Sequence, residues 1–505
     1  MAVLCDTISL NQFTFTMKPL FTYSALAGLL ALGACTDHRD PSSPDITLQN
    51  RSVTPVLAKL LPGATSGRVA ANQVNLYSLL SSDDQLEQSP AYVFGGSADG
   101  AGLFQNPDGN YTILVNNEDN FSVSRITLDK GFKPVKGEYV LNSDGGTWRL
   151  CSATLVTPAE HGFGPVFLTS GESGQESRTH ALNVDANVSQ ANISREVAGL
   201  GRWSAENAVP LPKTAYPGKT VIVIGDDDSD VNGGQVAMYL SNTVGDLDNG
   251  SLYMLKRADN NQREMDMKPG SVYDVEFVKI DNHKTLTGAQ INGKVNDLKA
   301  IKFGRVEDVD YRKGGAAQGR EVIFAVTGQE DKGVNADYSR SKYGRIYRVT
   351  LDANDPLKGK LEVLLDGDDR TGIAKTFQNP DNVCATFDYV YIMEDPNGYG
   401  DEKHDGYVYQ FNLNTKQLTP VLEIDHRRSE ADAAKYNVGG ASAFGSWESS
   451  GMIDVSDVTG RPNTFMLGIQ AHTWRGDKYK GVDGGSIRKS ENQASQLILI
   501  EGLPR

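Results

Sequence analysis

The chain has 505 residues, and its 49 Lys and Arg against 64 Asp and Glu give a formal net charge of −15. This balance excludes a typical nucleic-acid-binding protein, because such proteins bind phosphate backbones through clustered basic residues and no dense Lys/Arg cluster occurs here. Hydrophobic residues at 39% exclude disorder over most of the length, and 52 Gly with 20 Tyr and 17 Phe favour β-structure with many short turns.

The first predicted element is an export signal over residues 1–34. Lys18 precedes an apolar run at residues 20–32, and the sequence LGAC then ends at Cys35, as in a bacterial lipoprotein signal. We expect Cys35 to be the lipidated first residue of the mature chain and Met17 to be the true start. A transmembrane helix is the alternative, but a span needs about 20 apolar residues. The prediction is therefore a cell-envelope protein that contacts the membrane through its lipid anchor only.

Residues 35–89 are predicted to form a tether and an N-terminal segment, and from about residue 90 to 505 the chain repeats one pattern. A short β-rich run leads into an acidic, glycine-rich loop, and a second β-rich run follows. The clearest copies pair residues 221–224 with 235–240, 323–326 with 344–349, and 389–393 with 406–411, and weaker copies begin at 113–115 and 166–168. Recurring strand units without helical periodicity predict an all-β fold, a β-propeller with a central metal-binding channel. An array of β-sandwiches is the alternative.

Acidic residues stand at corresponding places beside these runs. In a propeller the loops that follow equivalent strands meet at the central channel, so we expect their carboxylates to converge. Several carboxylates at one site need cations between them, and oxygen ligands favour hard ions, above all calcium. For any single pair the alternative is a solvated loop tip. The candidate metal ligands are Glu118, Glu172, Glu206, Glu307, Asp308, Glu394 and Asp395.

One loop carries a local calcium pattern. Asp228, Asp230 and Asn232 supply oxygen ligands at alternate positions, and Gly233 permits a sharp turn. The twelfth position is Tyr239 instead of Glu, so the loop is not an EF-hand. An ordinary Asx-rich turn is the alternative.

Other catalytic signatures are absent from the sequence. It contains no HExxH zinc motif, no GxSxG nucleophile motif and no GxxxxGK[ST] phosphate loop, and its seven histidines are widely spaced. Beyond the signal region only Cys151 and Cys384 remain, too few for a disulfide scaffold.

Several short motifs together point to a family. In chain order they are FQNPDGNYTILVNNED (104–119), CSATLVTPAEHGFGPVFLTSGES (151–173), GRWSAE (201–206), FGRVED (303–308), PDNV (380–383), WESSGMIDVS (447–456) and LGIQAHT (467–473). Their order and spacing over roughly residues 90 to 475 resemble the PhoX-type alkaline phosphatases. The resemblance implies a β-propeller whose channel holds an iron and calcium cluster and which acts on phosphate esters outside the cytoplasm.

The resemblance also implies roles for individual residues. Glu118 matches the acidic end of the family's NHE motif, and Glu206 matches the glutamate of its GRFxHE motif. Arg305 matches the phosphate-contacting arginine, and Glu307 a metal-binding glutamate. The PDN motif and the acids after it imply ligand or outer-sphere roles for Asp381, Asn382, Glu394 and Asp395.

The sequence also departs from the family's pattern. Asn117 and Ala205 stand where the family has histidines, and Ser170 and Gly171 replace a cysteine and a glutamate. Cys151 matches an earlier family cysteine and is a candidate metal ligand. Because a thiolate and a carboxylate are missing, calcium is better supported as cofactor than iron.

The predicted function is an exported, metal-dependent phosphatase for phosphate monoesters, with Arg305 contacting the phosphoryl group. We expect a monomer with a small phosphorylated substrate and no nucleic-acid partner. Two alternatives remain: another calcium-dependent propeller hydrolase acting on lactones or esters, and a non-catalytic surface lipoprotein that kept the fold.

Overall fold

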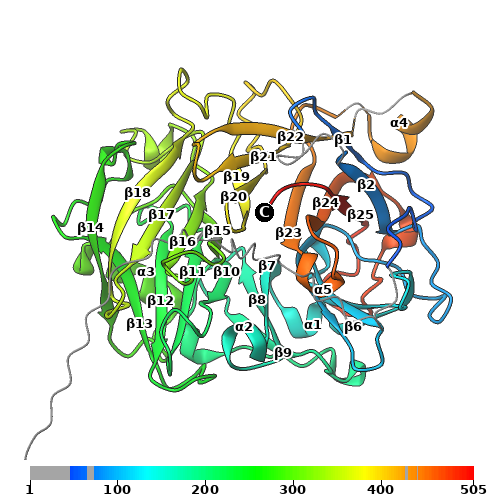
Figure 1. Ribbon diagram of the computed structural model, residues 1–505, viewed down its shortest axis with the longest axis horizontal. Helices are drawn as coiled ribbons and strands as arrows, with labels where there is room; N and C mark the ends of the chain where they lie inside the picture. Colours follow the sequence, from blue (N-terminus) through cyan, green and yellow to red (C-terminus); the bar gives the residue numbers. More distant parts are fainter. Residues whose placement is uncertain (1–45, 65–72, 427–429, 441) are drawn as a thin grey trace, which may run out of the picture. The chain divides into compact units, whose positions relative to one another are not determined.

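The computed structural model in Figure 1 describes residues 46–64, 73–426, 430–440 and 442–505. These residues belong to one unit, Pro44–Arg505. Cys35 and the export signal lie outside the described residues. No helix in the described part of the chain is long and apolar enough to cross a membrane.

Antiparallel strands make up six successive blades of the described chain. The first blade contains β3 (Ala98–Gln105), β4 (Tyr111–Asn117), β5 (Ser122–Leu128) and β6 (Pro134–Leu141), and the second contains β7 (Arg149–Val156), β8 (Val166–Glu172) and β9 (Thr179–Asn183). The third contains β10 (Ala205–Pro210), β11 (Thr220–Asp226), β12 (Gln235–Ser241), β13 (Ser251–Arg257) and β14 (Val272–Ile280). The fourth contains β15 (Val306–Tyr311), β16 (Glu321–Val326), β17 (Arg345–Leu351) and β18 (Lys358–Asp366), and a β14–β18 pairing joins it to the third in one nine-stranded sheet.

The last two blades recruit strands from the start of the chain. The fifth contains β19 (Pro380–Ala385), β20 (Tyr389–Glu394), β21 (Tyr407–Asn412), β22 (Leu418–Ile424) and β1 (Ala58–Leu60). The sixth contains β23 (Glu448–Asp454), β24 (Thr464–Arg475), β25 (Gln493–Glu501) and β2 (Asn75–Ser81). The sequence placed the start of the propeller at about residue 90, whereas β1 and β2 both belong to its sheets. Pairing β2 with β25 joins the two ends of the described chain in one blade and so closes the ring.

The first strand of each blade contacts the first strand of the next. The contacts run from β3 to β7, β10, β15, β19 and β23, and from β23 back to β3, so these strands form a closed ring. Figure 1 shows β7, β10, β15, β19 and β23 around its centre. The prediction of an all-β propeller with a central channel is confirmed.

Apolar clusters between neighbouring blades form the core. The run Val221–Ile222–Val223–Ile224 in β11 shows why its sequence is continuously apolar. Val221 and Val223 pack with the fourth blade, and Ile222 and Ile224 pack with the second. Because alternate side chains of a strand point to opposite faces of its sheet, a strand covered on both faces needs no polar alternation.

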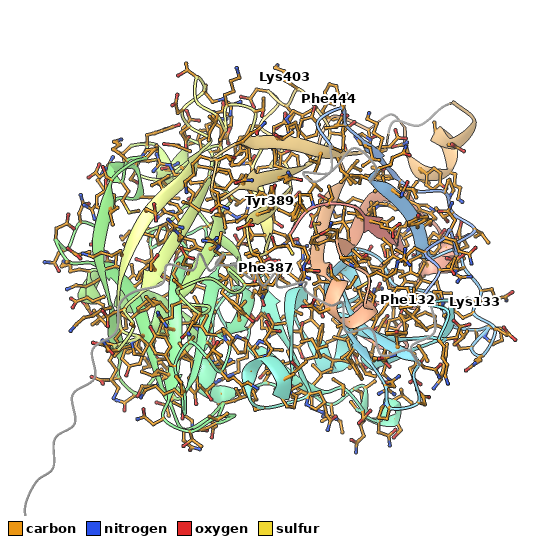
Figure 2. The ribbon with its side chains drawn as sticks, in the orientation of Figure 1. Phe132, Lys133, Phe387, Tyr389, Lys403 and Phe444 are labelled. Carbon is orange, nitrogen blue, oxygen red and sulfur yellow. The ribbon has the colours of Figure 1, made fainter. Side chains whose placement is uncertain are left out.

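Helices are few and short in the described chain. They are α1 (Ser143–Gly146), α2 (Pro158–His161), α3 (Gly288–Leu298), α4 (Glu430–Tyr436) and α5 (Ser456–Thr459). Figure 2 places Phe387, in the turn between β19 and β20, near the centre of the view, where the Arg505 guanidinium lies 5.0 Å from its ring centroid.

Candidate metal centre

The same irregularity recurs in all six strands of the central ring, although in β23 it lies between Ser450 and Ile453, with Gly451 as its first residue. The register with the second strand shifts between Ala98 and Ala101 in β3, and between equivalent residues of β7, β10, β15 and β19. A bulge re-aims the side chains of its extra residues. In the five strands other than β23, the first residue inside the shift carries an acid or a thiol: Asp99, Cys151, Glu206, Glu307 and Asp381. The sixth ring strand, β23, begins instead with Glu448.

A second set of acids comes from the second strands of the blades. Each member ends its strand or directly follows it: Glu118 after β4, Glu172 at the end of β8, Asp227 after β11 and Asp395 after β20. The prediction that acids beside equivalent strands converge therefore describes this set. Of the acids on the bulges, the sequence predicts Glu206 and Glu307 beside the runs, and the bulge is what turns them inward.

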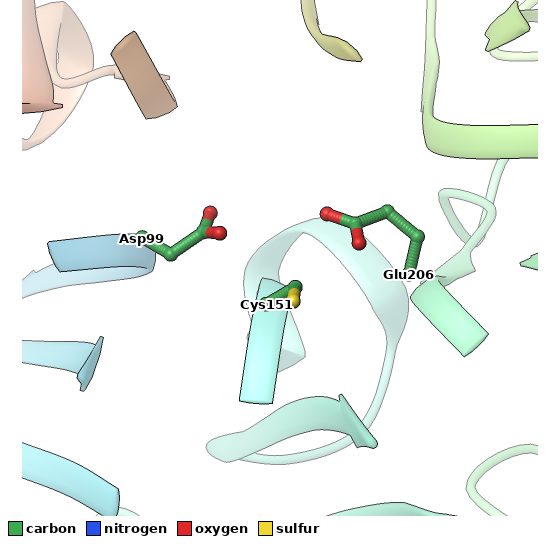
Figure 3. A group of neighbouring side chains, drawn as sticks. All are labelled: Asp99, Cys151 and Glu206. Carbon is green, nitrogen blue, oxygen red and sulfur yellow. The ribbon is translucent and has the colours of Figure 1, made fainter. Parts of the chain in front are cut away.

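These side chains lie close enough to share metal ions. Ligand atoms of Asp99, Cys151 and Glu206 lie within 4.8 Å of one another, and Figure 3 shows the three side chains pointing toward a common space. Two further groups satisfy the same distance and overlap with the first: Glu118 with Cys151 and Glu172, and Asp99 with Glu118 and Glu448. Because the groups share members, they form one continuous cluster, which we call the channel cluster.

The channel cluster contains more acidic groups than the neighbouring arginines, Arg149 and Arg305, can neutralise. Burial raises the pKa of Asp99, Glu172, Glu206 and Glu448 well above the ordinary range, and neighbouring carboxylates add to the rise. The same holds for Glu307 and Asp381 on the equivalent bulges of β15 and β19. Such a site must take up protons or bind cations.

Individual atoms of the cluster fit bound cations. Asp99 Oδ1 is buried and has no hydrogen-bond partner among the described residues. The Cys151 thiol donates to Glu172 Oε2 at 2.8 Å, and burial raises its pKa well above the ordinary range. Carboxylate oxygens suit a hard ion such as calcium, and a deprotonated Cys151 would suit a softer transition metal. The residues present therefore fit a metal centre, and the structure leaves the identity of the ion open.

Arg305 lies at the edge of the channel cluster. Its Nε donates to Asp227 Oδ1 at 2.7 Å, Nη2 lies 2.9 Å from Glu307 Oε1, and Nη1 donates to Asn397 Oδ1 at 2.8 Å. Burial opposes its charge, yet Asp227 and Glu307 raise the pKa of Arg305 well above its ordinary value. The backbone of Arg305 is left-handed, with φ at 71°, which costs a non-glycine residue on the order of 1 kcal/mol. The fold thus holds a permanent cation beside the acids.

Two predicted ligands lie outside the channel cluster. Glu394 is the register partner of Pro380, and its carboxylate accepts hydrogen bonds from the backbone amides of Gln378 at 2.7 Å and Tyr407 at 2.9 Å. Asp308, the second residue of its bulge, accepts from Asn207 Nδ2 at 2.7 Å. Both carboxylates hold the fold together through these bonds.

The two polar residues of the PDN motif, Asp381 and Asn382, have different roles in the structure. Asp381 holds the place on the bulge of β19 that Glu206 holds in β10. Burial raises its pKa well above the ordinary range, and the charges of Glu206 and Glu448 add to the rise. Asn382 donates from Nδ2 to Ser152 Oγ at 3.0 Å and to Glu206 Oε1 at 3.4 Å. Asn382 therefore orients the Glu206 carboxylate by donating a hydrogen bond to it, which is the role of an outer-sphere residue.

The calcium-like loop has its oxygens occupied by amide donors. Asp228 Oδ1 accepts from the Asp230 amide at 2.8 Å, and Asp230 Oδ1 accepts from the Asn232 amide at 2.6 Å. The Asn232 side-chain oxygen accepts from Asn296 Nδ2 at 2.9 Å. This geometry is that of the Asx-rich turn.

Sequence reasoning did not select Asp99 or Glu448 as ligands. Asp99 stands alone among small residues in the stretch GGSADGAG, and Glu448 lies in a serine-rich stretch, so neither has an acidic neighbour to mark it. The available signal is position, because Asp99 occupies the same place in the first blade as Glu206 in the third.

A separate cavity of about 260 Å³ lies toward the other ends of the ring strands. Ser152, Asn207 and Asp308, which follow the inward-facing bulge residues, border it, and Leu103 and Leu155 are among its apolar walls. None of the channel-cluster carboxylates lines this cavity. The cavity is therefore distinct from the candidate metal centre.

Comparison with solved structures supports the fold. Pseudomonas fluorescens PhoX, in complex with the transition-state analogue vanadate, aligns over 90% of this chain and 99% of its own, with a TM-score of 0.59 and 14% sequence identity. The GH93 α-L-arabinofuranosidase of Fusarium graminearum, in complex with arabinobiose, aligns over 84% and 97%, with a TM-score of 0.38 and 9% identity. No protein family and no curated protein matches the sequence. At 14% identity the likeness to PhoX establishes the propeller and leaves the activity to the residues of this chain.

Proposed function

We propose that this protein is a metal-dependent hydrolase of phosphate esters. The observation that carries the proposal is the pairing of an acid-rich channel, which needs cations, with one buried, permanently charged guanidinium at its edge. Phosphate esters are anions, and a cation-loaded channel beside Arg305 offers them complementary charge. The PhoX-like fold supports this choice. So does the FGRVED motif, in which Arg305 and Glu307 stand two residues apart, as the resemblance to PhoX-type phosphatases implies.

The proposed cofactors are calcium at the oxygen-lined positions and iron beside Cys151. The residues that would hold them are Asp99, Cys151, Glu206, Glu118, Glu172 and Glu448, with Glu307, Asp381 and Asp395 close by. Such ions supply Lewis acidity toward phosphoryl oxygens and activate water for attack.

The chain's own part is to bind and orient the phosphoryl group. Asp227, Glu307 and Asn397 hold the Arg305 guanidinium through Nε, Nη2 and Nη1, so that its plane has a fixed direction. A guanidinium held in this way loses little entropy when its remaining Nη1 hydrogen meets a phosphoryl oxygen, and that contact strengthens as negative charge develops there. The buried walls around Glu172 and Glu206 limit the water that competes for these contacts.

The test is hydrolysis of p-nitrophenyl phosphate by purified protein with and without EGTA. The proposal expects turnover that EGTA removes and added metal restores. Turnover of lactones or carboxylic esters instead would favour another propeller hydrolase. Metal-loaded protein without either activity would favour a non-catalytic binding protein.

Location is a separate proposal. The predicted lipid anchor at Cys35 would place the active site in the cell envelope, where an exported phosphatase would meet substrates outside the cytoplasm.

A further inference from the structure

Arg149 occupies the same place in the second blade that Arg305 occupies in the fourth. Arg149 precedes the bulge residue Cys151 by two positions, and Arg305 precedes the bulge residue Glu307 by two positions. Arg149 is the first residue of β7, and Arg305 directly precedes β15. Both side chains therefore start from the same end of a central ring strand.

The acidic partners of the two arginines are also equivalent. Glu118 follows Asn117, the register partner of Ala98, in the first blade, and Asp227 follows Asp226, the register partner of Ala205, in the third. Arg149 Nη1 lies 3.2 Å from Glu118 Oε1, and Arg305 Nε lies 2.7 Å from Asp227 Oδ1. Each arginine thus reaches back to the second-strand acid of the preceding blade, and the blade repeat has produced the same ion pair twice.

Both arginines contact acids of the candidate metal centre. Arg149 pairs with Glu118, whose ligand atom lies within 4.8 Å of those of Cys151 and Glu172. Arg305 pairs with Asp227 and with Glu307, which holds the place in β15 that Cys151 holds in β7. The two guanidinium groups therefore lie beside the same ring of inward-facing side chains.

The Arg149 side chain is more exposed than that of Arg305 and makes fewer polar contacts with the protein. It is 41% exposed, against 22% for Arg305. Arg305 uses Nε, Nη1 and Nη2 on protein acceptors, whereas the Arg149 guanidinium has one polar contact among the described residues, from Nη1 to Glu118, and its unpartnered Nε is buried. A guanidinium with donors to spare at the mouth of a cation-loaded channel is suited to meet an incoming anion.

We infer that Arg149 is a second substrate-contacting residue, which with Arg305 forms a two-arginine clamp for the doubly charged phosphoryl group of a phosphate monoester. This inference rests on the proposed function and narrows its substrate class. A monoester offers three non-bridging oxygens and close to two charges, enough to pair with two guanidinium groups. A diester offers two such oxygens and one charge, so its charge pairs with only one of them.

The first test is calorimetric titration of inorganic phosphate into metal-loaded protein. Arg149→Ala is expected to weaken phosphate binding about 10- to 100-fold, the range for a charged hydrogen-bonded contact. Arg149→Lys should recover part of the loss, because it keeps the charge and loses the fork. The matched control is Arg488→Ala, which removes a guanidinium 3.8 Å from Asp119 and should change affinity no more than about twofold in physiological salt.

The second test compares kcat/KM for p-nitrophenyl phosphate and bis(p-nitrophenyl) phosphate. Wild-type protein should prefer the monoester, and Arg149→Ala should lose monoester turnover at least about tenfold more than diester turnover. Metal content and Tm, measured on the same samples, should match those of wild type.

The outcomes separate the two proposals. If wild type binds phosphate and Arg305→Ala weakens it while Arg149→Ala does not, the clamp is refuted and the phosphatase stands. Equal losses of monoester and diester turnover in Arg149→Ala would also refute the clamp. If metal-loaded wild type binds no phosphate at all, the proposed function fails and the clamp fails with it.

Discussion

Replacing Glu206 with Gln is predicted to stabilise the metal-free protein and to remove most of the stabilisation that bound metal provides. Glu206 Oε1 accepts hydrogen bonds from the Ser152 hydroxyl at 2.8 Å and the Ser152 amide at 3.2 Å, and an amide of similar shape can keep an acceptor there. Burial raises the pKa of Glu206 well above its usual range, and the charges of Asp99 and Glu172 raise it further. A carboxyl group whose pKa is raised by folding destabilises the fold above its unfolded pKa. The metal-free variant should therefore be more stable at pH 8 than metal-free wild type.

The magnitudes follow from linkage. Each unit by which folding raises the pKa costs about 1.4 kcal/mol once the pH exceeds both values, so removing even one unit of strain stabilises the metal-free fold by about that much. With metal present at 100 times its Kd, wild type gains about 2.7 kcal/mol. Loss of a charged ligand should weaken binding at least about 100-fold, which leaves the variant about 0.4 kcal/mol at the same metal concentration.

Urea unfolding at pH 8, with EGTA and then with saturating calcium, measures both effects. The control is Glu138→Gln, which alters a partly exposed carboxylate paired with Arg125 at 2.7 Å on β6, the strand at the opposite edge of its sheet from the ring strand β3. Its response to calcium should equal that of wild type. If calcium stabilises Glu206→Gln as much as wild type, Glu206 is not a ligand and the reasoning is refuted.

Four further predictions follow from the same contacts. Arg305→Ala should keep its metal and lose about 100-fold or more in turnover of p-nitrophenyl phosphate. The control is Arg348→Ala, which breaks a 2.6 Å ion pair to Glu362 away from the channel and should keep full turnover. Equal rates in the two variants would refute the role of Arg305. Cys151→Ser should lose iron and retain calcium in elemental analysis, and iron retention would show that the thiol is not a ligand. Metal-free wild type should lose stability as the pH rises from about 5 to about 8, because its folded state holds more protons than its unfolded state; a rise in Tm over that range would contradict the raised carboxyl pKa values. Cys35→Ser should abolish metabolic labelling with fatty acid, and undiminished labelling would overturn the lipoprotein prediction.

The strands were predictable because each blade is covered on both faces. The apolar runs at residues 221–224, 323–326 and 389–393 became β11, β16 and β20 for the reason that Val221 and Ile222 show, with alternate side chains in different interblade clusters. β1 and β2 lack such a signal, since only their pairing with β22 and β25 places them in blades. That pairing joins residues more than 360 positions apart, and no local pattern encodes it.

The candidate site divides along similar lines. Acid pairs after second strands were visible, yet period-two alternation decides which member points inward: Glu394 bonds to backbone amides, and Asp395 joins the cluster. The bulge acids depend on a register shift, which is a property of two strands together. Sequence alone therefore reached Glu206 and Glu307 through their place beside the β-rich runs and through a family resemblance, and did not select Asp99.

Elemental analysis of purified, extensively dialysed wild-type protein tests the central claim most directly, because the account requires the bulge-borne acids to hold cations. We predict calcium in at least stoichiometric amount, lost on dialysis against EGTA together with thermal stability and regained on adding calcium. A folded protein that carries no metal, and whose Tm is unchanged by calcium, iron or EGTA, would contradict the account.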